Sequence, residues 1–310
     1  MTEFSTPVLP LCNGIYGILT ALDEKRSSYV KPDQSPVTLA DLSVQVFIID
    51  WITRHFPGDY IIAEERSSGA TSADLRRFIE DHPSLYPDLT RSPDVVLDDQ
   101  GRSATGPVWY IDPIDGTKGY LRREQFAVAI SRYDSTGEPL LACLYCPNLP
   151  FPTLDSAQKG SLFYWETGKK PVQLSLQTPD DVQILPLSPS VSALATSVEK
   201  SHGNAPVAQQ VANDLGLQVI EMDSQAKYGL LLRGEASAYL RYPTDSVYLE
   251  KTWDHAAGAA LLRAAGGTVT EVTGDPVVIR RTATLEKPNG VAATLGIDHQ
   301  SLIQSIRNHT

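Results

Sequence analysis

The stretch "VWYIDPIDGTKGYLR" (residues 108–122) limits the possible folds more than any other part of the chain. It begins with the apolar and aromatic residues of a buried strand and then changes to acids, Gly and charged side chains. Asp112 closes the expected strand, and Asp115 follows it on the other side of Pro113. Because an unpaired carboxylate in a partly buried position is costly, a cation has to compensate Asp112. The chain must therefore fold so that a cation can reach the end of this strand.

Two further acids occur in similar settings. Glu64 follows a short buried strand, and Asp254 lies at the start of a helix expected over residues 253–265. Carboxylates without paired His or Cys ligands favour Mg²⁺, held together with water and substrate phosphate, and disfavour zinc. Gly116 and Thr117 add free backbone amides and a hydroxyl that can receive phosphate. Several such ions can activate a water, clamp a phosphoryl group and neutralise the leaving oxygen, so the pattern predicts metal-assisted phosphoryl chemistry.

The first half of the chain reads as a mixture of helices and antiparallel strands. Apolar residues at helical spacing predict a helix over 39–56, which Pro57 and Gly58 end. The other expected elements of this half are a strand within 59–69, a short helix from Pro93 to about Asp99, a hairpin of residues 125–133 and 139–146, and strands over 161–165 and 172–176.

From about residue 190 the pattern changes to strands that alternate with helices. The expected elements are strands over 192–197, 217–222, 237–242 and 267–272, and helices near 205–215, near 225–233 and over 253–265. Alternation of this kind is typical of an α/β unit, here following an α+β unit, with the Pro-rich stretch 184–190 as the joint. We therefore expect two domains, residues 1–187 and residues 188–310.

Composition limits the classes of partner. The chain has 310 residues, with 26 Lys and Arg against 37 Asp and Glu, a net charge of -11. This charge disfavours nucleic acid and anionic membranes as partners, so we expect neither. Cys12, Cys143 and Cys146 are too few for a disulfide framework, and the residues after Met1 do not form a secretion signal. We expect a cytoplasmic protein.

Four segments together resemble a known family. These are "AEERSSG", "WYIDPIDGTKGYLRREQFAV", "DSQAKY" and "WDHAAG", which are similar to the Mg²⁺-dependent, lithium-sensitive phosphatases of the inositol monophosphatase superfamily. "KPDQSPVTLAD", "SVEKSH" and "YLRYP" narrow the resemblance to its 3'(2'),5'-bisphosphate nucleotidase branch, and the match runs from Lys31 to about Gly267. The resemblance implies a layered αβαβα sandwich that combines α+β and α/β parts. It also implies that the first domain binds metal and the second binds the nucleotide.

The resemblance assigns roles to individual positions. It implies two or three Mg²⁺ ions, held by four carboxylates and one carbonyl: Glu64, Asp112, Asp115, Asp254 and the carbonyl of Ile114. Asp41 is expected to pair with Thr117 and to orient and deprotonate a metal-bound water, so these two are the expected catalytic residues. The positions expected around the substrate are Thr117, His202, Ser224, Lys227, Arg241 and Asp254.

The function that the resemblance implies is hydrolysis of the 3'-phosphate of adenosine 3',5'-bisphosphate (PAP) to AMP and phosphate. The sulfated relative PAPS is a second expected substrate, giving APS, in the context of sulfur assimilation. Lithium and sodium inhibition and a monomeric state are also expected. Acidic clusters of this kind also serve inositol polyphosphate 1-phosphatases, and a non-catalytic phosphonucleotide sensor is the alternative of another class. A haloacid-dehalogenase-type phosphatase is disfavoured because it needs D-x-D where this chain has D-x-x-D.

The first 30 residues depart from the family pattern. Relatives begin with a long helix, whereas Pro7, Pro10 and Gly14 here leave room for only a short helix over about 15–25.

Overall fold

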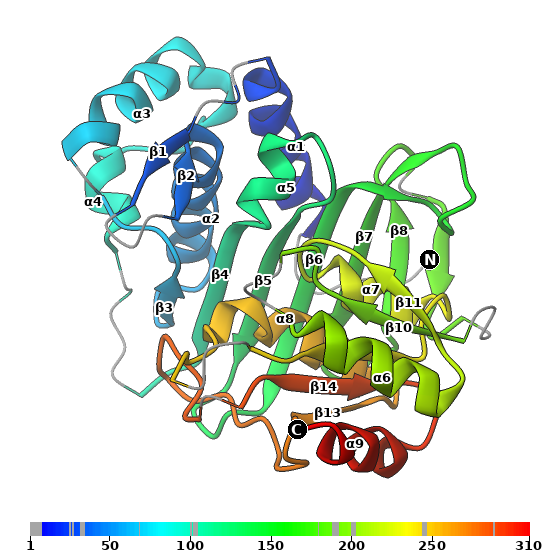
Figure 1. Ribbon diagram of the computed structural model, residues 1–310. Coiled ribbons are helices and arrows are strands. Elements are labelled where there is room, and N and C mark those ends of the chain that lie inside the picture. The colour runs from blue at the N-terminus through cyan, green and yellow to red at the C-terminus, as the bar shows by residue number, and fades with distance from the viewer. Residues whose placement is uncertain are drawn as a thin grey trace.

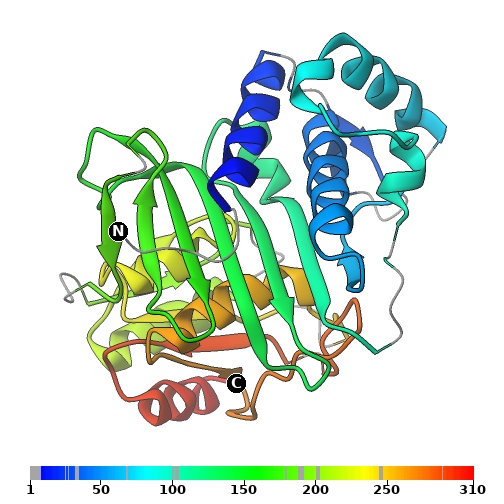
Figure 2. The same ribbon diagram turned by 180° about the vertical axis from the view of Figure 1, so that it is seen from behind.

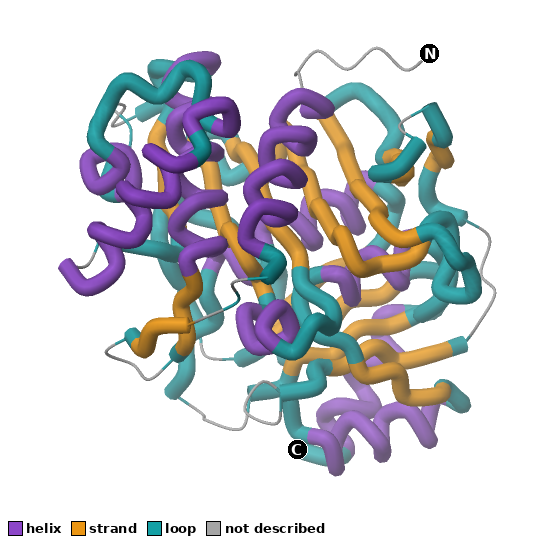
Figure 3. The backbone as a smooth tube through the Cα atoms, turned by 90° about the horizontal axis from the view of Figure 1, so that it is seen from above, coloured by secondary structure: helices purple, strands orange, loops and turns teal. Residues whose placement is uncertain are grey.

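The computed structural model describes most of the chain. The described residues are 8–24, 26, 28–31, 35–67, 69–99, 101, 105–178, 180–187, 192–199, 203–243, 247–287 and 289–310. They form five layers in the order helices, sheet, helices, sheet, helices (Figure 1). Seen from above, helices lie on both sides of the strands (Figure 3). The predicted αβαβα sandwich is therefore confirmed.

The larger sheet contains, among the described residues, seven strands in the spatial order β3-β4-β5-β6-β7-β8-β9. The strands are β3 (Tyr60–Ala63), β4 (Val108–Asp115), β5 (Ala127–Tyr133), β6 (Pro139–Pro150), β7 (Lys159–Glu166), β8 (Val172–Ser175) and β9 (Val182–Ile184). β3 and β4 are parallel, and each later neighbour is antiparallel. The predicted hairpin of β5 and β6 is confirmed.

β4 is longer than the sequence pattern predicted. The strand continues through Pro113 to Asp115, and its register against β5 shifts between Asp112 and Asp115. The shift lets the strand pass the proline, which has no N–H to give to the ladder. The two acids thus stand on an irregular strand end and not on a turn.

Helices cover the outer face of this sheet. They are α1 (Val8–Leu22), α2 (Leu39–His55), α3 (Gly69–Asp81), the 3-10 turn η1 (Pro83–Leu85) and α4 (Pro93–Leu97), with the hairpin β1 (Ser28–Val30) and β2 (Pro36–Thr38) beside them. Figure 2 shows α1 and α2 on this side of the sheet. α2 begins with a capping box, because Thr38 accepts from the backbone of Asp41 and the Asp41 side chain accepts from the backbone of Thr38.

The predicted short N-terminal helix is wrong. α1 begins at Val8, before Pro10, and its apolar side chains pack against α2 and the sheet. Pro10 lies in the first turn, where a missing N–H costs no helical hydrogen bond. Gly14 allows the close approach, since a Cβ there would lie 2.0 Å from the ring of Phe47 in α2.

A second helical layer separates the two sheets. It consists of α7 (Ala226–Leu232), the 3-10 turn η3 (Thr252–Asp254) and α8 (Ala256–Ala264). The predicted helix over 253–265 is thus divided at His255, so Asp254 belongs to the tight turn before α8. A short helix α5 (Thr117–Leu121) follows β4.

The second sheet contains, in the described part of the chain, five strands in the order β11-β10-β12-β14-β13. The strands are β10 (Ala193–Thr196), β11 (Gln218–Glu221), β12 (Ala238–Arg241), β13 (Thr268–Glu271) and β14 (Val291–Thr294). Its outer face is covered by α6 (Ala205–Leu215) and α9 (His299–Asn308). The sequence pattern did not predict α3, β9, β14 or α9.

Apolar side chains join the two halves of the chain. One buried cluster takes Ala129 and Phe163 from the larger sheet, Leu261 from α8, and Ala195 and Ala293 from the second sheet. The two predicted domains, divided between residues 187 and 188, therefore share one continuous core. The division into two domains stays a prediction. Among the described helices, none combines the length and apolar character needed to cross a bilayer.

Candidate active site

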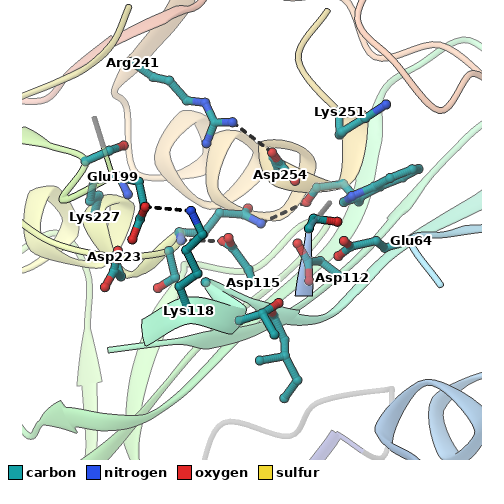
Figure 4. Close-up of a pocket in the computed structure, with 18 of the residues that line it drawn as sticks. Glu64, Asp112, Asp115, Lys118, Glu199, Asp223, Lys227, Arg241, Lys251 and Asp254 are labelled. Atoms are coloured by element: carbon teal, nitrogen blue, oxygen red, sulfur yellow. Dashed lines mark hydrogen bonds and ion pairs between the residues drawn. The ribbon is translucent and has the colours of Figure 1, made fainter. Parts of the chain in front are cut away.

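A cavity of about 510 Å³ is lined by almost all of the residues that the sequence analysis predicted for the site. The residues predicted for the site that line it are Glu64, Asp112, Ile114, Asp115, Thr117, Ser224, Lys227, Arg241 and Asp254. Figure 4 shows the four labelled acids of this set around a common space, with Arg241 and Lys227 on the opposite side from Glu64. His202 lies outside the described residues.

Parallel pairing explains why the acids meet. Glu64 follows β3 and Asp112 lies in β4, and the backbone N–H of Glu64 donates to the carbonyl of Ile111 over 3.1 Å. The carboxyl ends of parallel neighbours lie at one edge of a sheet, so residues 48 positions apart become neighbours there. η3, which contacts β4, brings Asp254 to the same edge.

Asp112 is buried close to other acids. Burial raises its pKa well above the usual value, and the charges of Glu64, Asp115 and Asp254 raise it further. Its Oδ1 is buried and has no hydrogen-bond partner among the residues that the structure describes. Burial likewise raises the pKa of Asp254 to about 8, although Arg241 opposes the shift. A cation at this wall would remove both penalties, so the wall fits a metal ion.

The acids of this wall do not enclose an ion by themselves. Among the residues that the structure describes, no three Asp, Glu, His or Cys side chains lie close enough to enclose one ion by themselves. Mg²⁺ commonly takes only one or two carboxylates and completes its shell with water and substrate phosphate.

Asp41 and Thr117 lie in contact behind the acidic wall. The hydroxyl of Thr117 is 3.4 Å from Asp41 Oδ1 and 3.2 Å from the carbonyl oxygen of Ile114. The other carboxylate oxygen of Asp41 accepts from the N–H and hydroxyl of Thr38. Asp41 is fully buried, and burial raises its pKa to about 7. Thr117 thus connects a buried carboxyl group with the cavity.

Lys31 is a cavity residue to which the sequence reasoning gave no role. Its Nζ lies 2.7 Å from Glu64 Oε1 and 2.6 Å from Glu65 Oε1. Although burial lowers the pKa of Lys31, these two carboxylates raise it overall. Burial and the charges of Glu64 and Asp41 raise the pKa of Glu65 to about 9. The only sequence signal for Lys31 was its place before "PDQSPVT" in the family resemblance.

The opposite wall of the cavity is basic. Lys227 in α7 donates to the carbonyl of Met222 over 3.0 Å, and its Nζ lies 5.5 Å from the ring centroid of Tyr239. Burial lowers the pKa of Lys227 to about 8, while Asp115 opposes the shift. Arg241, at the end of β12, is also buried and is paired with acids. Lys227 and Arg241 thus add two buried cations to a cavity lined by acids, and Arg241 is paired directly with one of these acids, Asp254.

A tight backbone contact fixes the middle of the cavity. Gly116 has φ 85°, and a Cβ there would lie 3.3 Å from the Cβ of Ser224. Ser224 itself has φ 65°, which is uncommon for a residue other than Gly. This turn directs the backbone N–H of Gln225 to Asp115 Oδ2, at 2.5 Å.

Ion pairs cross the mouth of the cavity. Lys118 pairs with Glu199 over 2.9 Å, and Arg122 pairs with Glu199 over 2.9 Å and with Asp223 over 2.6 Å. The sequence reasoning left Lys118 and Arg122 outside the site and missed Glu199 and Asp223. Glu199 and Asp223 lie inside the segments "SVEKSH" and "DSQAKY" of the family resemblance, but their pairing with residues about 80 to 100 positions earlier became visible only in the fold.

Comparisons with known proteins show the family and the fold of the chain. The model of the inositol monophosphatase family matches residues 14–310. A "3'(2'),5'-bisphosphate nucleotidase" of Emericella nidulans is 33% identical over 322 residues, which cover 92% of this chain and 91% of the relative. A protein of the same name from Schizosaccharomyces pombe is 34% identical over 294 residues, covering 85% of this chain and 81% of the relative. The solved structure of an "IMPase/NADP phosphatase complexed with Mg2+ and phosphate" has a TM-score of 0.64 at 14% identity, covering 96% of this chain and 92% of the other. This last likeness shows a shared fold.

Proposed function

This chain belongs to the inositol monophosphatase family, and from that premise we propose that it is a 3'(2'),5'-bisphosphate nucleotidase. It removes the 3'-phosphate of PAP and releases AMP and phosphate, and it also converts PAPS to APS. Two or three Mg²⁺ ions take part. The names of the curated relatives at 33% and 34% identity support the substrate class.

One observation carries the proposal: the same cavity has an acidic wall and, opposite it, a wall with two buried cations. A substrate with a single phosphate would need only the acidic wall with its metal ions. A bisphosphate has a second, non-reacting phosphate, which requires positive charge at a distance from the reaction. The arrangement of Arg241 and Lys227 supports that second requirement.

The acidic wall would hold the metal. Glu64, Asp112, Asp115, Asp254 and the carbonyl of Ile114 all line the cavity, and the buried Oδ1 of Asp112 has no other partner. When bound there, Mg²⁺ would supply Lewis-acid stabilisation of the negative charge on the reacting phosphate.

Asp41 and Thr117 would handle the proton of the attacking water. The hydroxyl of Thr117 faces the cavity and can donate to Asp41 while its lone pair accepts a hydrogen bond from a water. A base works best when its pKa is near the working pH, and burial places the pKa of Asp41 at about 7. Thr117 would thus orient the water, and Asp41 would receive its proton through the hydroxyl.

The basic wall would bind the 5'-phosphate, which does not react. A contact of this kind contributes equally to the bound substrate and the transition state, so its loss raises KM more than it lowers kcat. Ser224, Lys227 and Arg241 line this part of the cavity.

Phosphate release from a set of substrates tests the proposal. PAP, PAPS and inositol 1,4-bisphosphate are compared, each with Mg²⁺, with chelator, and with Mg²⁺ plus Li⁺. We expect the highest kcat/KM on PAP, no turnover in chelator, and inhibition by Li⁺. Preference for the inositol substrate would assign the chain to the inositol polyphosphate 1-phosphatases. Tight PAP binding without phosphate release would favour the non-catalytic sensor.

A further inference from the structure

Arg241 is held by two acids that lie on different sides of it. Its Nε lies 2.7 Å from Glu250 Oε2, and its Nη2 donates to Asp254 Oδ2 over 3.1 Å. Asp254 lines the cavity, whereas Glu250 is 1% exposed and does not belong to the cavity lining. The guanidinium therefore has its Nε side paired with an acid outside the cavity lining. Its Nη edge points to Asp254 in the cavity, as Figure 4 shows.

Glu250 is in turn held by a buried pair. His255 Nε2 lies 3.4 Å from Glu250 Oε2, and His255 Nδ1 lies 3.1 Å from the hydroxyl of Tyr228. A carboxylate can only accept, so Nε2 carries the hydrogen, and Nδ1 accepts from the Tyr228 hydroxyl. His255 and Tyr228 are both fully buried. The contacts run without a gap from Tyr228 through His255 and Glu250 to Arg241.

The position of Tyr228 is set by the backbone of α8. A Cβ on Gly258 would lie 2.0 Å from the Tyr228 ring, so only Gly lets the ring approach the helix. Gly258 and His255 both belong to the segment "WDHAAG", and both lie against Tyr228.

This chain of contacts determines which edge of Arg241 a ligand can reach. A phosphate would compete with the Asp254 carboxylate for the Nη edge that faces the cavity, whereas the Glu250 carboxylate forms an ion pair on the Nε side of the guanidinium. Without Glu250, the guanidinium is free to turn and to satisfy Asp254 alone, in a geometry unsuited to a phosphate. When the orientation of a guanidinium is already fixed before the ligand binds, binding costs little conformational entropy.

We propose that Glu250 and His255 are positioning residues for the second phosphate of the substrate, because they fix Arg241 with its Nη edge toward the cavity. The inference rests on the proposed function, since it takes Arg241 as the partner of the 5'-phosphate. Neither residue touches the reacting atoms. Their effect is confined to substrates that carry this second phosphate.

Glu250→Gln tests the proposal, with PAP and adenosine 3'-monophosphate as paired substrates. The variant keeps the side-chain shape and removes the charge that holds Arg241. We expect KM for PAP to rise about tenfold and KM for the monophosphate to change less than about twofold, with kcat nearly constant on both. In the double variant Glu250→Gln, Arg241→Ala, the KM for PAP should equal that of Arg241→Ala alone, because the two residues act as one unit.

Glu235→Gln is the matched control. Glu235 is a buried acid paired with the buried Arg233, and it accepts from the backbone of Leu154 over 2.6 Å, outside the cavity lining. This variant should shift the melting temperature and leave the KM ratio of the two substrates unchanged. Equal KM increases on both substrates in Glu250→Gln, or additive effects in the double variant, would overturn the proposal.

Tyr228→Phe provides a second test if Glu250→Gln does not fold. It removes one hydroxyl at the far end of the chain of contacts, and we expect a rise of about threefold in KM for PAP only. An unchanged ratio would mean that Tyr228 and His255 only support the core. The activity of the wild-type protein distinguishes the proposed function from the positioning role of Glu250 and His255. If the wild-type protein released no phosphate from PAP, the proposed function would be refuted whatever the variants do.

Discussion

Asp115 is held from two directions. Its Oδ2 accepts from the backbone N–H of Gln225, and the charge of Lys227 acts on the same carboxylate. Burial raises its pKa, and these two contacts oppose the shift. The residue is thus a charged group whose orientation depends on the second half of the chain.

Asp115→Asn should abolish turnover without unfolding the protein. The amide oxygen can still accept from Gln225, whereas the charge that binds a metal ion is lost. We expect kcat on PAP to fall at least about 100-fold and the circular dichroism spectrum to stay unchanged. Asp155→Asn, at an exposed acid outside the cavity lining, is the control. Retained activity in Asp115→Asn would remove this residue from the site.

The raised pKa values of the buried acids predict how pH affects the metal-free protein. The pKa values of Asp41 and Asp254 are raised to about 7 and about 8, chiefly by burial. Such a group binds more protons when folded, so its contribution to stability is full below the unfolded pKa and is lost as pH rises through the folded pKa. Between its unfolded and its folded pKa, each such group lowers the free energy of unfolding by up to about 1.4 kcal/mol for each unit by which the pH rises.

In chelator, the melting temperature should therefore fall as the pH rises from about 6.5 to about 8. The lowered pKa values of His255 and His299 change the stability little in this range, because both histidines are mostly neutral in the folded and the unfolded protein. Mg²⁺ favours the ionised carboxylates, so it should raise the melting temperature more at the higher pH. Scanning fluorimetry with chelator, Mg²⁺ or Na⁺ at matched ionic strength measures this. A Mg²⁺ effect that is equal at both pH values would contradict the prediction.

Residues of the site were predictable where a motif surrounds them. Asp112, Asp115 and Asp254 were found because each lies in a distinctive local sequence, and all three line the cavity. Glu250 was not found, because its importance comes from partners brought near by the fold and not from its sequence neighbours.

At the level of elements, α8 depends on one close contact. The ring of Tyr228 occupies the space where a side chain on Gly258 would lie. We expect Gly258→Ala to lower the free energy of unfolding by about 1–3 kcal/mol, because the ring must move out of a packed core. Gly58→Ala is the control, since no atom lies within 4 Å of a Cβ at that position. Urea unfolding measures both variants, and equal stabilities would contradict the prediction.

Elements were predictable where periodicity is strong and ends are marked. α2 has apolar residues at helical spacing and Pro57-Gly58 after it, and the structure confirms it. α1 was predicted too short because Pro10 was taken as a breaker, although the first turn of a helix tolerates proline. β4 was predicted too short for a similar reason, since a register shift lets a strand pass Pro113.

At the level of the whole molecule, the continuous core predicts cooperative unfolding. The buried cluster that includes Phe163, Ala195 and Leu261 takes side chains from both predicted domains. We expect one calorimetric transition whose calorimetric and van't Hoff enthalpies agree. Two resolved transitions would instead support independent domains at residues 1–187 and 188–310. The monomeric state and the cytoplasmic location stay predictions.

The hydrogen bond from Gln225 to Asp115 joins groups that are 110 positions apart in the chain. A proposed metal ligand from the first half is thus aligned by the backbone of the second. Catalysis can begin only after both halves have docked, so the recovery of enzyme activity after dilution from denaturant would report the last step of refolding. A nascent chain released from the ribosome too early would be unable to hydrolyse nucleotides.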